Sequence, residues 1–236
     1  MKLIFTHSNL KVGDFFSPSA TDQRHLIKVL RLKRGDVVEA SDGKSRLKCK
    51  IARVNSKVEL EVTAVEPLID RRKVSLAIAK IETSRFSSAV SAAAQMAVKE
   101  VYAFGCDRAE RAPLALERLK RVAVESAKQV GCPFLPALYE LRGITELAEK
   151  IQGRPTFLLD PFAPTTLLES FPYQLDDRGL ILICGPAGDF TAQERQQLQR
   201  AGAQPVQLCS EILRSETAAV VALGVTATCI RTSRQE

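Results

Sequence analysis

Over the first 70 residues, hydrophobic and polar positions alternate with a period of two, which is the pattern of half-buried β-strands. The clearest alternating segments are residues 36–41, 45–54 and 58–65. Asp42 and Gly43 lie between the first two segments, and an Asp-Gly pair in that position is a strong signal for a β-hairpin. Residues 21–30 have a helical pattern instead. We therefore predict a small β-barrel domain with one helix over residues 1–70.

The pattern changes at Lys73, where short apolar runs begin to alternate with segments of helical periodicity. The apolar runs predict buried strands at residues 74–79, 101–104, 156–159, 180–184 and 206–210. The periodic segments predict helices at residues 84–98, 113–130 and 143–151, and a further helix that begins at Thr191. Strands that alternate with helices form a mostly parallel sheet covered on both faces. We predict an α/β domain over residues 73–236.

Two loops near the end of the chain carry the most informative residues. Gly185-Pro-Ala-Gly-Asp189 follows the run at 180–184, and residues 211–217 follow the run at 206–210. In an open α/β sheet, ligands bind at the carboxyl ends of the strands. The glycine loop matches neither the dinucleotide motif GxGxxG nor the P-loop motif GxxxxGK(S/T). Either it lets a ligand approach the backbone closely, or it is only a tight turn between a strand and a helix.

The second loop places charged side chains among apolar ones. Arg214 and Glu216 come just before the apolar run at residues 218–223. Charged groups are rarely buried without a partner. The segment is therefore either a functional site or an Arg214–Glu216 ion pair that ties the loop to a helix capped by Ser215 or Thr217.

The net charge of +7 is concentrated at the N-terminal end of the chain. Residues 1–72 contain 15 Lys and Arg against 9 Asp and Glu. Concentrated positive charge is typical of nucleic-acid-binding proteins, although it also serves solubility. Arg24, Lys28 and Arg31 are spaced to share one face of the predicted helix, which indicates either phosphate contacts or a solvated surface. The neighbouring His25 is a weak candidate for a general base, since a lone histidine is more often structural.

Other features of the composition exclude several classes of protein. Six cysteines and two histidines are scattered without a CxxC pair, so we expect no metal site. No apolar run approaches the ~18 residues that a membrane span needs, and the N-terminus lacks the apolar core of a signal peptide. We expect a cytoplasmic protein without a membrane partner.

Five segments, in this order, resemble the ribosomal RNA small subunit methyltransferase E family of the SPOUT superfamily. His25–Arg31 is similar to the family's HHxxVLR segment, and Arg34–Gly43 resembles its G-D…D-G hairpin. Arg118–Gln129 is similar to the family helix that ends in EAxxQ. Leu182–Glu194 resembles the loop IGPEGGFSxxE, and Leu208–Ala218 resembles the signature LGxRILRxETA. The matching segments span nearly the whole chain.

The resemblance implies a fold, a cofactor and a reaction. The N-terminal domain would be a PUA-like RNA-binding β-barrel, and residues 73–236 would be a SPOUT methyltransferase domain whose C-terminus threads into a trefoil knot. A homodimer would use S-adenosylmethionine to methylate N3 of a uridine in 16S ribosomal RNA of the small ribosomal subunit. The alternatives are an RNA-binding protein that lacks methyl transfer and a methyltransferase with a different RNA target.

The resemblance, together with the pattern of charged and apolar residues, leads us to predict three groups of site residues. The cofactor-binding residues would be Leu159, Asp160, Pro161, Gly185, Pro186, Gly188, Asp189, Phe190, Leu208, Cys209, Ser210, Ile212 and Leu213. The RNA-binding residues would be Arg24, His25, Lys28, Arg31, Arg108 and Arg118. The catalytic residues would be Arg214, which stabilises developing negative charge, and Glu216 and Thr217, which orient it.

Several positions depart from the family pattern. The family's GPEGG is Gly-Pro-Ala-Gly-Asp here, so Ala187 stands in place of a glutamate and Asp189 in place of a glycine. Cys209 stands in place of a glycine, and Glu211 and Cys132 stand where the family has arginines. A cysteine in place of a glycine could crowd a cofactor, and the lost cations could weaken RNA placement. These departures motivate the alternative without methyl transfer.

Overall fold

The computed structural model describes residues 3–6, 9–55, 57–172 and 175–232, and the chain forms two compact units. The N-terminal unit comprises residues 1–71 and 127–135, and the C-terminal unit comprises residues 72–126 and 136–236. Within the N-terminal unit, a buried ion pair joins Lys128 Nζ to Asp22 Oδ1 at 2.8 Å. The sequence pattern contains no sign that residues 127–135 belong with the first unit.

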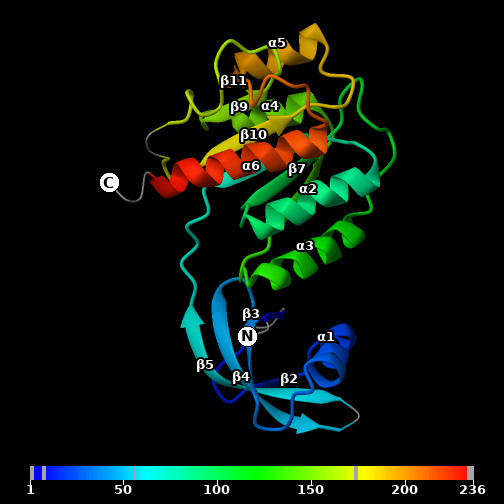
Figure 1. The fold of residues 1–236 in the computed structure, drawn as a ribbon, viewed down its shortest axis with the longest axis vertical. Helices are drawn as coiled ribbons and strands as arrows, with labels where there is room; N and C mark the ends of the chain where they lie inside the picture. Colours follow the sequence, from blue (N-terminus) through cyan, green and yellow to red (C-terminus); the bar gives the residue numbers. More distant parts are fainter. Residues whose placement is uncertain (1–2, 7–8, 56, 173–174, 233–236) are drawn as a thin grey trace. The chain divides into compact units, whose positions relative to one another are not determined.

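The N-terminal unit is built on a five-stranded mixed sheet (Figure 1). Its strands are β1 (Leu3–Phe5), β2 (Phe15–Phe16), β3 (Val37–Ser41), β4 (Ser45–Val54) and β5 (Val58–Pro67), in the spatial order β1-β3-β4-β5-β2. The predicted hairpin is confirmed, because β3 and β4 pair antiparallel around Asp42 and Gly43. Asp42 Oδ1 accepts hydrogen bonds from the backbone N–H groups of Lys44 and Ser45, and Gly43 has a φ of 81°. In the described residues the strands form an open series, with β1 and β2 at its ends.

The helix predicted at residues 21–30 is shorter and less regular than expected. Helix α1 spans Ala20–Arg24 and continues as a π-helical turn, η1, over His25–Val29. A π-helical turn is wider than an α-helical one, so the spacing of side chains on its surface differs. Arg31 lies beyond the turn with a left-handed φ of 53°. The single α-helical face predicted for Arg24, Lys28 and Arg31 is therefore wrong, although all three residues are exposed.

The C-terminal unit contains a six-stranded, all-parallel sheet in the order β11-β9-β10-β6-β7-β8. The strands are β6 (Val74–Ala79), β7 (Glu100–Phe104), β8 (Ala137–Leu141), β9 (Thr156–Leu159), β10 (Leu180–Cys184) and β11 (Ala203–Val206). Strands β6, β7 and β8 lie side by side in chain order and reach one edge of the sheet. The chain then returns to β9, which is separated from β6 by β10. The strand order therefore reverses between β6 and β10, and ligands bind beside such a reversal.

In the C-terminal unit, two strands differ most from the sequence prediction. Strand β8 was not predicted, because it is an edge strand whose residues are mostly exposed and include Glu140. Strand β11 ends at Val206, where the predicted strand began. The next residue, Gln207, pairs instead with the loop after β9, since its N–H donates to Thr165 and its carbonyl accepts from Leu167.

Helices cover both faces of this sheet (Figure 1). On one face, α4 (Ile144–Ile151) and α5 (Ala192–Arg200) bury Leu147 and Leu198 against Ile181 and Ile183. On the other face, α6 (Ser215–Thr232) packs against β6, β10 and α2 (Thr83–Gln95). Helix α3 spans Leu116–Val130, so its residues up to 126 belong to this unit and its last four to the N-terminal unit. Within the described residues, no helix is long and apolar enough to cross a membrane.

Candidate functional site

Three loops at the carboxyl ends of β9, β10 and β11 enclose a cavity of about 440 Å³. Most of the predicted cofactor-binding residues line it: Leu159, Asp160, Pro161, Gly185, Pro186, Gly188, Asp189, Leu208, Cys209, Ile212 and Leu213. The structure therefore brings together residues that lie up to 54 positions apart in the chain. The walls are mainly apolar, with a few polar groups, as in typical small-molecule sites.

Phe190 and Ser210 do not line this cavity. Phe190 is only 5% exposed, and its ring stacks on Phe104 in the core with 6.2 Å between the ring centroids. Ser210 is exposed and donates a hydrogen bond to Glu211 Oε1 at 2.8 Å. Phe190 therefore belongs to the core beside the loop, and Ser210 lies outside the cavity lining.

Sequence reasoning left out several lining residues of the cavity. They are Phe162, Ala187, Glu211, Ser215 and Ala218, and the catalytic candidate Arg214 also belongs to the lining. Four of the five lie within Leu182–Glu194 and Leu208–Ala218, the two segments that resemble family motifs. A prediction that included every residue of these segments would have contained them. Phe162 is 78% exposed, and an apolar side chain in that position directly after the Asp160–Pro161 turn was the available signal.

Gly185 allows the cavity loop to pass over a buried ring. A Cβ added at Gly185 would lie 2.8 Å from Cε2 of Phe190, closer than side-chain carbons pack. The carbonyl oxygen of Gly185 accepts a hydrogen bond from Ser215 Oγ at 2.7 Å. This bond ties the loop after β10 to Ser215. Because Ser215 is the first residue of α6, it does not stand at the N-cap position just before the helix, which was one of the predicted alternatives.

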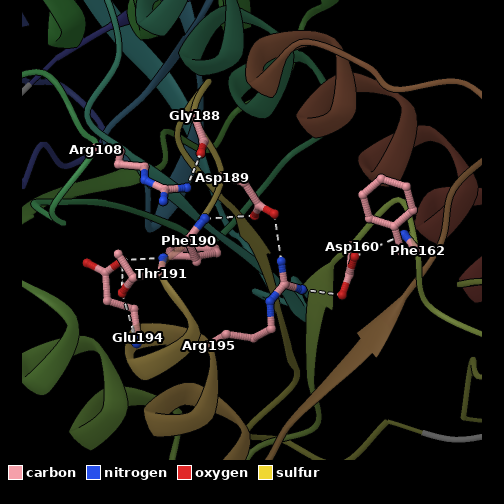
Figure 2. A network of polar contacts seen from close by, with 9 residues as sticks. All are labelled: Arg108, Asp160, Phe162, Gly188, Asp189, Phe190, Thr191, Glu194 and Arg195. Carbon is pink, nitrogen blue, oxygen red and sulfur yellow. Dashed lines mark hydrogen bonds and ion pairs between the residues drawn. The ribbon is translucent and has the colours of Figure 1, made fainter.

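Arg195 of α5 connects the two loops that precede it in the chain, as Figure 2 shows. One guanidinium nitrogen donates to Asp160 Oδ2, and the other donates to Asp189 Oδ2 at 2.7 Å. Asp189 has a left-handed φ of 60°, and its Oδ1 accepts from the backbone N–H of Phe190 at 2.7 Å. Non-glycine residues rarely adopt this conformation, although aspartate tolerates it better than most.

The sequence predicted a helix that begins at Thr191, and a capping box fixes the start of α5 at this residue. Thr191 Oγ1 accepts from the backbone N–H of Glu194, and Glu194 Oε2 accepts from the backbone N–H of Thr191. Glu194 Oε1 also accepts from the backbone N–H of Asp107 at 2.8 Å. This carboxylate therefore links the loop after β7 to the loop after β10.

A second, smaller cleft of about 90 Å³ adjoins the cavity. The two share Ala187, Arg214 and Ser215 as a common wall. The cleft is rich in charge: its lining includes the cations Lys80, Arg85, Arg108 and Arg214 and the carboxylates Glu82, Glu110 and Glu216. An excess of cations beside a largely apolar cavity is an arrangement that attracts an anionic or polar ligand.

The catalytic candidates do not form the pair that the sequence allowed. Glu216 approaches Arg85 of α2 at 3.9 Å, and its side chain is 17% exposed. Arg214 is exposed, its carbonyl accepts the first hydrogen bond of α6 from Ala218, and its side chain borders both cavities. Thr217 is exposed on the first turn of α6 and lines neither cavity.

The predicted RNA-binding residues fall into both units. Arg24, Lys28 and Arg31 are exposed in the N-terminal unit, where His25 is half-buried at the start of η1. In the C-terminal unit, Arg108 lines the second cleft and donates to the carbonyl oxygen of Gly188 at 2.7 Å. Arg118 is exposed near Glu82: the pKa of Glu82 is lowered mainly by its hydrogen bonds from Ser84, and also by the charges of Arg85 and Arg118.

Two buried or half-buried thiols, Cys106 and Cys184, are not poised as nucleophiles. Burial raises the pKa of the Cys106 thiol to about 11, and burial also raises the pKa of Cys184. Only a thiolate is an effective nucleophile. In the described part of the chain, no three histidine, cysteine or carboxylate side chains gather as a metal site would need.

Comparison with known proteins identifies the family. The family model of the RNA methyltransferase domain matches residues 69–227, which is most of the chain and includes every loop of the cavity. The chain belongs to this family. The family predicted from the sequence motifs, a SPOUT-type RNA methyltransferase of the small subunit methyltransferase E kind, is therefore confirmed.

Curated relatives of this RNA methyltransferase carry the name ribosomal RNA small subunit methyltransferase E. The protein of Mesomycoplasma hyopneumoniae is 28% identical over 65% of this chain and 68% of its own length. The protein of Synechocystis is 28% identical over 86% of this chain and 70% of its own. That of Rickettsia conorii is 23% identical over 94% and 93%, respectively.

Solved structures have the same fold as this RNA methyltransferase. The ribosomal RNA small subunit methyltransferase E of Neisseria gonorrhoeae, bound to S-adenosylmethionine, has a TM-score of 0.84 with 22% identity over 97% of each chain. A protein of Legionella pneumophila in complex with the same cofactor has a TM-score of 0.80 with 23% identity over 96% of each chain. At these identities the likeness establishes the fold: a mixed N-terminal sheet and an all-parallel C-terminal sheet with helices.

The departures from the family pattern lie in two places. Ala187, Asp189, Cys209 and Glu211 belong to the cavity lining. The Cys209 thiol lies 3.4 Å from the carbonyl oxygen of Glu211 and donates to it. Cys132 lies in the N-terminal unit, where its thiol donates to the carbonyl of Phe134 at 3.4 Å.

Proposed function

We propose that the protein uses S-adenosylmethionine to methylate N3 of a uridine in small-subunit 16S ribosomal RNA. The observation that carries this proposal is the cavity at the carboxyl ends of β9, β10 and β11 in a member of the RNA methyltransferase family. Two structures of the same fold contain S-adenosylmethionine, and the curated relatives are named for the ribosomal RNA of the small subunit.

The chemistry of the cavity fits this cofactor. Leu159, Leu208 and Leu213 offer apolar walls for the adenine ring, and the loop backbones offer hydrogen-bonding groups. The lining carries three carboxylates, those of Asp160, Asp189 and Glu211, and one cation, Arg214. Arg195 lies outside the lining, where it pairs with Asp160 and Asp189. A net negative wall favours a ligand that carries a sulfonium and an ammonium group. When bound there, the cofactor supplies a methyl group that is activated by the positive sulfur.

The second cleft is suited to the uracil base. The reacting edge of uracil presents the N3–H donor between two carbonyl acceptors. Glu216 offers an acceptor in the cleft, and Arg85 and Arg214 offer donors on the same lining. We assign Glu216 to the N3 proton and Arg214 to the negative charge that develops on a carbonyl oxygen as the proton leaves. Arg214 borders both cavities, which supports a role for it between the methyl group and the base.

The proposal extends to the knot, the oligomeric state and the role of the N-terminal unit. We propose that the C-terminal segment, from Leu208 through α6, is threaded into a trefoil knot and that the protein acts as a homodimer. The N-terminal unit would be a PUA-like module that contributes RNA affinity through Arg24, Lys28 and Arg31, with His25 beside them. Its basic excess, 15 Lys and Arg against 9 Asp and Glu over residues 1–72, supports this division of labour.

The test is transfer of a labelled methyl group to small ribosomal subunits that lack the modification, followed by nucleoside analysis. We expect N3-methyluridine from the wild-type protein. Arg214→Ala should reduce kcat by about 100-fold or more, because removal of one preorganised electrostatic group costs that much in comparable sites. A labelled ribose or a different base would contradict the proposed reaction. Arg200→Ala, which removes an exposed arginine outside both cavities, should lower activity little and serves as the control.

A second candidate function is RNA binding without methyl transfer. The observation in its favour is that Cys209 and Glu211, which stand where the family has glycine and arginine, both line the cofactor cavity. This candidate predicts tight binding to ribosomal RNA with no turnover. The double variant Cys209→Gly/Glu211→Arg should then gain activity. Turnover by the wild-type protein at a rate typical of enzymes would rule it out.

A further inference from the structure

Arg195 reaches the cofactor cavity only through other residues. It lies on α5 and is not part of the cavity lining, but both of its carboxylate partners are. Asp160 follows β9 and Asp189 follows β10, so one guanidinium bridges two loops from separate strands (Figure 2). The planar fork of an arginine can hold two carboxylates in fixed geometry, which a lysine cannot do equally well.

Each of the two carboxylates is held at both oxygens. Asp160 Oδ1 accepts from the backbone N–H of Phe162 at 2.9 Å, and Asp189 Oδ1 accepts from the backbone N–H of Phe190 at 2.7 Å. The Oδ2 atoms of both face Arg195. Each carboxylate therefore binds the backbone of its own loop with one oxygen and Arg195 with the other. We call the ion pairs of Arg195 with Asp160 and Asp189 the bridge. The backbone N–H of Asp160 also donates to Val206 at 2.9 Å, which connects the bridge to β11.

The bridge is sheltered enough to matter energetically. The side chain of Arg195 is 23% exposed and that of Asp160 is 12% exposed, whereas Asp189 is 46% exposed. Without the guanidinium, two carboxylates on adjacent loops would lose their common partner, and the more buried one would be left uncompensated. The loops would then lose the contact that sets their spacing.

The backbone conformation at Asp189 is less favourable for aspartate than for glycine. Its φ of 60° is a conformation that glycine adopts without penalty. The family motif to which residues 182–194 are similar has a glycine in this position. The hydrogen bond to Phe190 and the ion pair with Arg195 give a physical reason for an aspartate in its place.

We propose that Arg195 is a positioning residue that sets the separation of the two cofactor loops, and that Asp189 completes this bridge in place of a glycine. The proposal rests on the proposed function, because the ligand of the cavity is S-adenosylmethionine. Arg195 acts on affinity through Asp160 and Asp189 and makes no contact with the cofactor itself. Its replacement changes the binding of cofactor more than it changes the chemical step.

The test is calorimetric titration of S-adenosylmethionine into the full chain, with steady-state kinetics alongside. Arg195→Met should raise Kd by about tenfold or more, and Asp189→Asn by about threefold, with a larger rise in KM for the cofactor than loss of kcat. The double variant should bind no more weakly than Arg195→Met, because the two residues act through one bridge. Arg195→Lys should recover part of the lost affinity. Arg200→Met, a change of an exposed arginine on the same helix, is the matched control and should leave Kd unchanged.

The outcomes separate this proposal from the proposed function. If the wild-type protein does not bind S-adenosylmethionine, the proposed function fails and the bridge proposal fails with it. If the wild type binds and a cooperatively folded Arg195→Met binds with the same Kd, only the bridge proposal is overturned. Should Arg195→Met not fold, Asp189→Asn decides, since asparagine tolerates the left-handed backbone and removes only the charge. Wild-type affinity in that variant refutes the role of Asp189 and of the bridge.

Discussion

Substitution of Gly185 by alanine probes the contact on which the cavity loop is built. The added Cβ would lie 2.8 Å from Cε2 and 3.1 Å from Cδ2 of the Phe190 ring. Carbon atoms pack at about 3.5–4.0 Å, so the ring or the loop must move by about 0.7 Å or more. Phe190 is 5% exposed and stacks on Phe104, and its ring therefore has no open space into which to retreat. Overpacking of this kind destabilises a protein by about 1–3 kcal/mol.

The same substitution should weaken cofactor binding. Gly185 lines the cavity, and its carbonyl accepts from Ser215 Oγ at the start of α6. A shift of the loop lengthens that hydrogen bond and narrows the space between the loops. We expect a fall in the free energy of unfolding together with a rise in the Kd for S-adenosylmethionine.

Urea denaturation and calorimetric titration measure the two effects. Gly224→Ala is the matched control, because its Cβ would meet nothing within 4 Å in α6 and alanine favours a helix by up to about 1 kcal/mol. The double variant Gly185→Ala/Phe190→Leu should recover part of the lost stability, since the smaller side chain removes the collision. A Gly185→Ala protein with both the stability and the cofactor affinity of the wild type would refute this account of the loop.

Three further predictions concern other parts of the chain. Burial would raise the pKa of Glu100, but hydrogen bonds from Ser75 and Tyr102 and the charge of Arg154 lower it below its ordinary value. Its stabilising contribution is therefore present above the unfolded pKa of about 4.3 and is lost as pH falls through the lower folded pKa, so Glu100→Gln should flatten the dependence of Tm on pH in acid. Thr191→Ala should cost about 1 kcal/mol in urea denaturation through loss of the capping box. The last prediction concerns the exposed cations Arg24, Lys28 and Arg31. Replacing all three with alanine should reduce the slope of log K for RNA binding against log salt concentration by about two units. An unchanged slope would show that these side chains are only solvated.

Much of the C-terminal unit could be predicted because its strands are buried apolar runs. Residues 74–79, 156–159 and 180–184 form strands with the predicted bounds. Parallel strands buried on both faces have few polar residues, so their limits are sharp in the sequence. Strand β8 escaped prediction because an exposed edge strand needs no apolar run. The sequence predicted the position of the helix at residues 21–30 but not its π-helical second half. Hydrophobic periodicity does not distinguish an α-helical turn from the wider turn of η1.

The candidate site could be predicted as a set of loops but not as a set of contacts. The motifs located the lining residues after β10 and β11, since glycines and clustered polar residues follow apolar runs there. The bridge from Arg195 to Asp160 and Asp189 could not be found in this way, because its members lie up to 35 positions apart and only the fold brings them together. The ion-pair partner of Glu216 could not be predicted for the same reason. It is Arg85, 131 positions earlier in the chain, and not the neighbouring Arg214.

The most direct test of the account is a crystal structure of the protein grown with S-adenosylmethionine. We expect the cofactor between the loops at residues 159–162, 185–189 and 208–215, with Arg195 still joined to Asp160 and Asp189 behind it. The methyl group should point toward Arg214 and the second cleft. Cofactor bound elsewhere in the chain, with this cavity empty, would contradict the account.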